Sequence, residues 1–209
     1  MLNVWNQAVW ERLRAIPLGA GGAVLLAGPR GVGKRSFART LAKALLCPRA
    51  RGGAEGCGEC ASCRLFEAAS HPDFRLVEPA AEDAGADAAP SQQTASAGTR
   101  AARVITVGQV RELAQFLDLT PHFGGSKVVL VEPADRMHAS AANALLKTLE
   151  EPPAGTLFLL VADQPSRLPV TVRSILSNGG ISFRLLTTAR RGGYHCGVAA
   201  LRTPLTRHN

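Results

Sequence analysis

The stretch GPRGVGK at residues 28–34 decides the fold of this chain, because of what stands on either side of it. Before it lies a short apolar run, AVLLA at 23–27, which is typical of a buried parallel strand. After it, SFARTLAKALL at 36–46 has the composition and spacing of a helix. A strand, a glycine-rich loop and a helix in this order form a phosphate-binding loop, in which backbone N–H groups and the helix N-terminus face the phosphates. We therefore predict a phosphate loop whose nucleotide-binding residues are Gly28, Gly31, Gly33 and Lys34.

Strand-like and helix-like segments alternate along the sequence on either side of this loop. The apolar patterns predict strands at 74–77, 128–131 and 156–162, and helices at 4–16, 64–70, 107–117 and 140–151. This alternation is typical of an α/β domain in which helices cover both faces of a parallel sheet. Such sheets bind ligands beyond the carboxyl ends of their strands, and the glycine loop stands at one of these ends.

Four cysteines follow the phosphate loop closely in the sequence. Three are spaced C-x2-C-x2-C, and an earlier cysteine completes the set: Cys47, Cys57, Cys60 and Cys63. Four thiolates in one short segment match the tetrahedral preference of structural zinc and leave no open coordination position for chemistry. We therefore predict an inserted zinc knuckle that braces the fold, and we interpret the fifth cysteine, Cys196, as an incidental thiol.

The N-terminal sequence MLNVWNQAVWERLRAI has no apolar signal core, and no window is long and apolar enough to span a membrane. These features predict a cytoplasmic protein without a membrane partner. In a reducing compartment, clustered cysteines are metal ligands more often than disulfides, which favours the zinc interpretation.

The positive charge is concentrated near the C-terminus. The formal net charge is +8, and residues 175–209 contain five arginines and no acidic residue. Basic segments attract nucleic acid by neutralising phosphates, but scattered arginines in a tail are often only solvated. The charge by itself therefore does not identify a partner.

Two positions that ATP hydrolysis requires carry the wrong residue type. In a working site the residue after the lysine gives a hydroxyl to Mg²⁺, but Arg35 stands there and Ser36 is displaced by one position. The strand at 128–131 should end in a metal-binding aspartate and a glutamate. It ends in Glu132 and Pro133, and Asp135 comes too late in the loop. We predict no catalytic residues and no hydrolysis, with two alternatives left open: a loop that still binds ATP or ADP, and a glycine-rich turn without any nucleotide.

Three further strings point to a known family. They are HPDF at 71–74, NALLKTLEEPP at 143–153 and RLPVTVRS at 167–174. With the altered phosphate loop and the four cysteines, these strings resemble the delta-prime family of bacterial DNA polymerase III in order and spacing. The resemblance implies an AAA+ module of the clamp loader, which places the sliding β clamp on primed DNA during replication. It also implies gamma or tau and delta subunits as partners, with hydrolysis performed by gamma or tau.

The resemblance extends from the start of the chain to about Ser174. In the family an arginine follows this serine and reaches a neighbouring ATP site, whereas this chain reads Ser174-Ile175-Leu176. We expect an AAA+ domain at 1–174, with the zinc knuckle at 47–63 and a flexible insertion at 79–103. We expect residues 175–209 to be a disordered basic tail, left by truncation or a frameshift.

Two other functions remain as alternatives. The first is an ATP-hydrolysing motor of the gamma or tau type, which the residues Arg35, Glu132 and Pro133 oppose. The second is a zinc-stabilised fragment that binds nucleic acid through its basic tail.

Overall fold

The computed structural model describes residues 10, 11, 13, 21–50, 55–79, 103–123, 125–178, 181–190 and 193–201, with side chains as far as residue 176. The strands are β1 Gly22–Ala27, β2 Phe74–Val77, β3 Lys127–Val131, β4 Thr156–Ala162, β5 Ile181–Arg190 and β6 Gly193–Leu201. The helices of four or more residues within these ranges are α2 Lys34–Leu46, α3 Ala61–Glu67, α4 Val107–Asp118, α5 Ala139–Glu150 and α6 Val170–Asn178.

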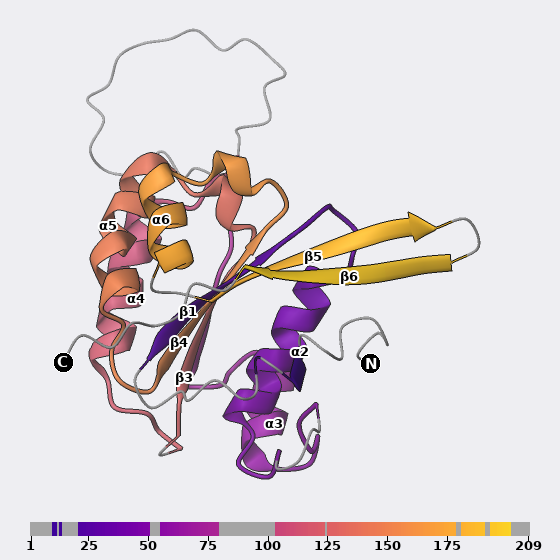
Figure 1. Ribbon diagram of the computed structural model, residues 1–209. Coiled ribbons are helices and arrows are strands. Elements are labelled where there is room, and N and C mark those ends of the chain that lie inside the picture. Colours follow the sequence, from indigo (N-terminus) through magenta and orange to yellow (C-terminus); the bar gives the residue numbers. More distant parts are fainter. Residues whose placement is uncertain are drawn as a thin grey trace, which may run out of the picture.

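The strands form one six-stranded sheet in the order β2-β3-β4-β1-β5-β6 (Figure 1). β1 pairs in parallel with β4 and β5, and the pairs β2–β3 and β3–β4 are also parallel. β6 pairs with β5 in the antiparallel direction and forms the far edge. The predicted α/β class with a parallel sheet and flanking helices is therefore confirmed.

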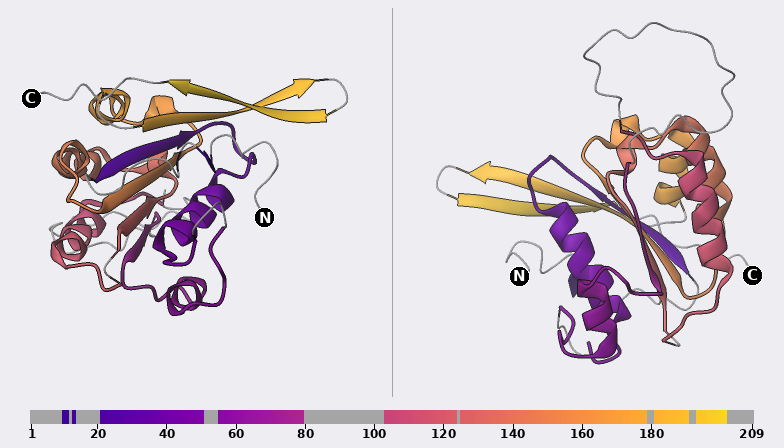
Figure 2. Two further views of the ribbon diagram at one scale, coloured as in Figure 1. Left: turned by 60° about the horizontal axis from the view of Figure 1, so that its bottom comes forward. Right: turned by 180° about the vertical axis from the view of Figure 1, so that it is seen from behind.

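Alternate residues of the central strands enter two hydrophobic cores, one on each face of the sheet. In β1, Val24 and Leu26 pack with Phe37 and Leu41 of α2 on one face. On the other face Leu25 belongs to a core that also contains residues of α4, α5 and α6. Figure 2 shows the two layers, with α2 and α3 on one side of the sheet and the other helices opposite. The period-two alternation of a strand explains why one apolar run supplies both cores.

Specific polar contacts determine where α4 begins and ends. At its start, Gln109 Oε1 accepts a hydrogen bond of 3.0 Å from the N–H of Thr106, as in a capping box. At its end, the buried ammonium of Lys127 donates to the carbonyl of Phe116 at 2.6 Å and also to that of Leu119. A cation at the helix C-terminus satisfies carbonyls that have no partner within the helix. Burial lowers the pKa of this lysine.

Two helices begin earlier than the sequence predicts. α2 starts at Lys34, directly after Gly33, because the left-handed conformation of Gly33 (φ 82°) turns the loop straight into the helix. α3 starts at Ala61 and not at residue 64, because the sulfur of Cys60 caps it by accepting from the N–H of Cys63 at 3.4 Å. A cysteine sulfur thus takes the place of the usual serine or aspartate side chain as the cap of this helix.

The C-terminal region differs from the disordered tail that we expect from the sequence. α6 continues to Asn178, and residues 181–190 and 193–201 form the β5–β6 hairpin, which extends the sheet beside β1. The sequence ISFRLLTT at 181–188 is rich in β-forming residues, and β1 would otherwise present an unpaired edge. Ser174 therefore lies inside α6.

Two other expectations fall wholly or mostly outside the described residues. These are the flexible insertion, of which 80–102 are not described, and the N-terminal helix, of which only residues 10, 11 and 13 are described. Trp10 and Leu13 are both buried against the core that contains α2. Among the described residues, no helix has the length and apolar character needed to cross a membrane.

Candidate functional site

The phosphate loop lies at the carboxyl edge of the sheet, between the ends of β1 and β4. The N–H of Gly28 donates to the carbonyl of Ala162, the last residue of β4, at 3.3 Å. The connection from β1 leads toward β2, whereas the connection from β4 crosses to β5 on the other side of β1. This is a topological switch point, the usual ligand site of an open α/β sheet. Gly31 (φ 87°) has open space where a Cβ would lie, so its backbone conformation, and not crowding, is what favours glycine there.

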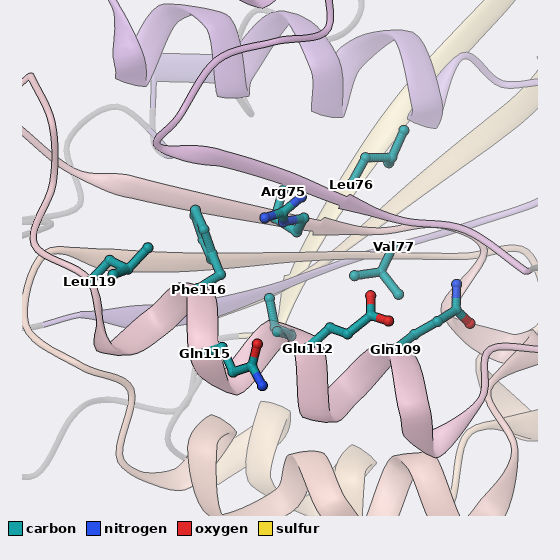
Figure 3. A pocket seen from close by; sticks show the side chains of 9 residues that line it. Arg75, Leu76, Val77, Gln109, Glu112, Gln115, Phe116 and Leu119 are labelled. Atoms are coloured by element: carbon teal, nitrogen blue, oxygen red, sulfur yellow. The ribbon is translucent and has the colours of Figure 1, made fainter.

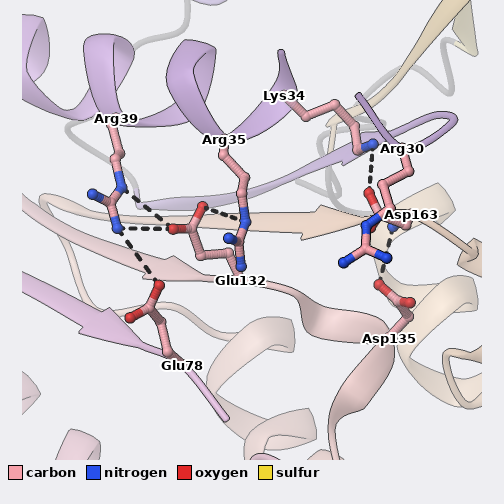
Figure 4. A network of polar contacts seen from close by, with 8 residues as sticks. All are labelled: Arg30, Lys34, Arg35, Arg39, Glu78, Glu132, Asp135 and Asp163. Carbon is pink, nitrogen blue, oxygen red and sulfur yellow. Dashed lines mark hydrogen bonds and ion pairs between the residues drawn. The ribbon is translucent and has the colours of Figure 1, made fainter. Parts of the chain in front are cut away.

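The ammonium group of Lys34 is fully engaged by groups of the protein itself. The side chain is only 3% exposed, and its Nζ lies 2.7 Å from the carbonyl oxygens of Gly28 and Pro29. It also lies 2.7 Å from Oδ1 of Asp163, directly after β4 (Figure 4). An ammonium group has three protons to donate, and these three oxygens can accept all of them.

Asp163 is the residue of this site that sequence reasoning missed. Its N–H donates to Oδ1 of Asp135 at 3.0 Å, and its Oδ2 lies 3.9 Å from Nε of Arg30. The available signal was a carboxylate directly after the apolar run 156–162, at the edge of the sheet where the loop also lies. No role is assigned to Asp135 from the sequence. In the structure its carboxylate holds Asp163 in place by accepting the backbone N–H of that residue.

One oxygen of the carboxylate that follows β3 is also hydrogen-bonded. Glu132 is 1% exposed, and its Oε1 accepts from Arg39 at 3.3 and 3.1 Å. Its Oε2 lies 3.9 Å from Nε of Arg35, which stands where a magnesium-binding hydroxyl would be needed (Figure 4). Arg39 also reaches Glu78 at 3.5 Å. Burial raises the pKa of Glu132, and the two arginines partly oppose that effect.

This arrangement pairs Lys34 with Asp163 and Oε1 of Glu132 with Arg39, whereas the buried Oε2 of Glu132 has no hydrogen-bond partner among the described residues. The residue after Lys34 offers a guanidinium, which cannot ligate a metal cation, and Pro133 stands where a water-polarising carboxylate would be needed. The structure therefore brings together all four predicted loop residues and the two substituted positions, Arg35 and Glu132, at one edge of the sheet.

The four cysteine sulfurs meet in a second cluster, between α2 and α3. All four Sγ atoms lie within 4.8 Å of one another, and the pairs Cys47–Cys60 and Cys57–Cys63 are 3.9 and 4.0 Å apart. Tetrahedral zinc with Zn–S bonds of about 2.3 Å requires sulfurs about 3.8 Å apart. The donor set and its spacing therefore fit a structural zinc ion.

Backbone N–H groups point toward these sulfurs. The N–H groups of Cys57, Cys60 and Cys63 donate to the sulfurs of Cys47, Cys57 and Cys60 respectively, each at 3.4 Å. Hydrogen bonds from Cys60 and Glu59 lower the pKa of the Cys57 thiol to about 6, whereas burial raises the pKa of the Cys63 thiol to about 12. Without a cation the cluster therefore does not favour four thiolates together, and a divalent ion would supply the compensating charge.

A buried polar network ties the cysteine cluster to the sheet. Ser62 donates to the carbonyl of Leu46 at 2.7 Å, next to Cys47, and lies 2.9 Å from Nε2 of His71. His71 Nδ1 accepts from the N–H of Asp73 at 3.0 Å, so its proton sits on Nε2 and is donated to Ser62. Serine, histidine and aspartate here do not form a hydrolytic triad, because the histidine offers Ser62 no free base.

We expect the stability of the chain to fall as the pH drops below about 6.5, the ordinary pKa of histidine. Burial lowers the pKa of folded His71, while Asp73 opposes and His122 reinforces the shift. Below pH 6.5 the imidazole is protonated in the unfolded chain but stays neutral in the folded chain. The contribution of His71 to the free energy of unfolding is therefore fully present above pH 6.5 and is lost as the pH falls. Chemical denaturation between pH 5 and 7.5 should show a smaller slope for His71→Asn, which keeps the acceptor for Asp73. An unchanged slope would contradict this role.

A surface groove of about 500 Å³ lies away from the phosphate loop, between β2 and α4 (Figure 3). Its lining mixes apolar residues such as Leu76, Leu113 and Leu119 with polar ones, and Arg75 stacks 5.2 Å above the ring of Phe116. The groove has a single carboxylate, Glu112, and no paired nucleophile and base. Its chemistry therefore does not suggest a catalytic site.

The structure is an α/β protein with a glycine-rich loop directly after β1 and a four-cysteine insertion after α2. A family model described as DNA polymerase III, delta subunit, matches residues 19–178. The chain therefore belongs to the delta-prime family of DNA polymerase III subunits, and the family resemblance seen in the sequence is confirmed.

Individual relatives agree with this assignment. The chain is 44% identical over 170 residues to the delta-prime subunit of Pseudomonas aeruginosa, covering 81% of this chain and 45% of that protein. It is 34% identical to the delta-prime subunit of Escherichia coli, over 81% of this chain and 46% of that protein. The tau/gamma subunit of Haemophilus influenzae is 36% identical, over 73% of this chain and 19% of that protein. The chain thus spans less than half the length of these relatives.

A solved structure shows the same fold. The crystal structure of a DNA polymerase III gamma subunit-related protein from Thermotoga maritima matches with a TM-score of 0.50 and 17% identity. The match covers 90% of this chain and 47% of that chain. At this identity the likeness shows a shared α/β fold and nothing finer.

Proposed function

We propose that the chain acts as a delta-prime-like subunit of the clamp loader and takes part in loading the sliding β clamp on primed DNA during replication. The carrying observation is the pairing of Arg35 and Arg39 with Glu132, at the positions where an ATPase of this fold would bind magnesium. This chemistry suits a subunit that shapes the complex without hydrolysing ATP. Its family membership and its relatives among the delta-prime subunits support the same role.

The proposed partners are the gamma or tau and delta subunits, with the β clamp and primed DNA reached through the complex in the cytoplasm. Ile175 stands where the family resemblance implies an arginine directed toward a neighbouring ATP site. An isoleucine side chain cannot stabilise charge on a phosphate, so we propose that this chain does not assist hydrolysis by a neighbour.

An ATP-hydrolysing motor of the gamma or tau type is the rival function, and the 36% identity to a tau/gamma subunit favours it. The site chemistry opposes it, because magnesium lacks a hydroxyl ligand next to Lys34 and the acidic group at Glu132 is paired with arginines. We therefore propose that the chain is neither a polymerase nor an ATPase by itself, although it belongs to a DNA polymerase assembly.

The two sites have separate proposed roles. Structural zinc would be held by Cys47, Cys57, Cys60 and Cys63, where it supplies positive charge that joins α2 to α3. The loop residues Gly28, Gly31, Gly33 and Lys34 form the altered nucleotide site. Between the two sites, α2 is the shared element, because Lys34 begins it and Cys47 follows its last residue.

Co-purification of the chain with gamma or tau and delta subunits is the direct test of this function. We expect a tagged chain to be retained with them, and we expect no ATPase activity above background from the chain alone, with or without primed DNA. Failure to associate with any clamp-loader subunit would contradict the role in the complex. Turnover that disappears in Lys34→Ala would instead support the motor function.

A further inference from the structure

Charged groups at the phosphate loop form ion pairs with other residues of the same chain. Lys34 pairs with Asp163, where a nucleotide phosphate would otherwise bind, and Glu132 lies near Arg35, where magnesium would otherwise bind. Lys34 would ordinarily contact phosphate oxygens. Here it contacts a carboxylate oxygen of Asp163 at 2.7 Å and two loop carbonyls. The lysine is 3% exposed, so a phosphate cannot reach it without displacing one of these oxygens.

Asp163 is held in place independently of the lysine. Its backbone N–H donates to Asp135 at 3.0 Å, and the strand that precedes it pairs with every residue of β1. The sheet therefore holds the backbone of Asp163 beside the loop, where its carboxylate reaches Lys34. An anion fixed beside Lys34 both neutralises the ammonium and repels an incoming phosphate.

Arg35 and Arg39 provide the matching cations on the other side of the loop. Their guanidinium groups lie 3.9 and 3.1 Å from the two carboxylate oxygens of Glu132, at the end of β3. In a working site, a carboxylate at this place would help to hold magnesium. The two arginines therefore offset part of the charge of Glu132 without a metal ion, while its Oε2 has no hydrogen-bond partner among the described residues.

We propose that Asp163 is an internal substitute for the nucleotide phosphate and that Arg35 is an internal substitute for magnesium, so that the two residues keep the loop closed. This inference rests on the proposed non-hydrolysing role and deepens it by naming the residues that would keep a nucleotide out of the loop in the isolated chain. Nucleotide binding by the isolated chain would contradict this inference without affecting the proposed association with clamp-loader subunits. Failure to associate with those subunits would contradict the proposed function without affecting this inference.

Titration calorimetry with AMP-PNP, a non-hydrolysable ATP analogue, tests the role of Asp163. We expect no saturable binding by the unaltered chain up to millimolar concentration. Asp163→Asn should bind at least about tenfold more tightly, because a charged hydrogen-bond acceptor no longer competes for Lys34. Asp135→Asn is the matched control, since it removes the same charge nearby but keeps an oxygen for the N–H of Asp163. Equal affinity of the two variants would overturn the proposal.

A second variant tests the role of Arg35. In Asp163→Asn alone, magnesium should leave AMP-PNP affinity unchanged, because no hydroxyl ligand is present. In Asp163→Asn combined with Arg35→Thr, magnesium should raise the affinity several-fold, because the threonine hydroxyl and Glu132 can both bind the ion. The same magnesium response in both variants would overturn the assignment of Arg35.

The unaltered chain gives a measurement that does not depend on the folding of any variant. Lys34 should react with an amine-acylating reagent far more slowly than the exposed Lys147, as followed by peptide mass spectrometry. Addition of AMP-PNP and magnesium should not change this ratio. Labelling of Lys34 as fast as Lys147, or protection that appears only with AMP-PNP, would show that the loop is open and would overturn the proposal.

Discussion

Replacing Cys60 with serine is expected to lower zinc affinity by more than about a hundredfold and to unfold the segment from Cys47 to Cys63. Cys60 has two structural roles. Its sulfur is 3.9 Å from that of Cys47, and it accepts the N–H of Cys63 that begins α3. Elemental analysis of protein purified without chelator should give about one zinc per unaltered chain, as a closed four-thiolate site requires. The variant should contain almost none.

Cys196→Ser is the control for this experiment, because Cys196 lies in β6 and is not one of the four clustered cysteines. It should keep the full zinc content. Hydrogen exchange should show that chelation exposes the amides of residues 55–67 while the amides of β3 and β4 stay protected, because the strands belong to separate cores. Unchanged zinc content in Cys60→Ser, or no zinc in the unaltered chain, would rule out the metal site.

Replacing Lys34 with methionine is expected to destabilise the fold by about 3 kcal/mol, which is large for a residue of a ligand-binding loop. Methionine keeps an apolar stem of similar length but removes the donors to Gly28, Pro29 and Asp163. For a chain of this size the melting temperature should fall by roughly 6–12 °C. Thermal unfolding followed by circular dichroism, without nucleotide, measures the effect directly.

Lys147→Met is the matched control, because Lys147 is exposed on α5 and the same substitution there should change the melting temperature little. A double-mutant cycle adds a sharper criterion. Lys34→Met should cost less in the Asp163→Asn background than in the unaltered chain, because part of its effect is the loss of that ion pair. Equal costs in both backgrounds would show that the two residues are not coupled.

The sequence by itself was enough for the α/β class, for the place of the glycine-rich loop between a strand and a helix, and for the cysteine cluster, because each depends on local pattern. A buried parallel strand such as 128–131 is a continuous apolar run, and the glycine spacing of 28–34 has few other structural explanations. The cysteine spacing brings three sulfurs together within one short loop, and Cys47 stands at the end of the preceding helix. The substitutions at Arg35 and Glu132 could also be located by counting from these motifs.

The tertiary structure decided which groups those residues contact. Asp163 is far from Lys34 in the sequence, and only the pairing of β4 beside β1 places its carboxylate 2.7 Å from the ammonium. The contacts of Arg39 with Glu132 and of Ser62 with His71 likewise depend on how helices pack against the sheet. The C-terminal hairpin was not predicted either, because a strand that completes a sheet edge gains its hydrogen bonds from a distant partner, which local composition does not show.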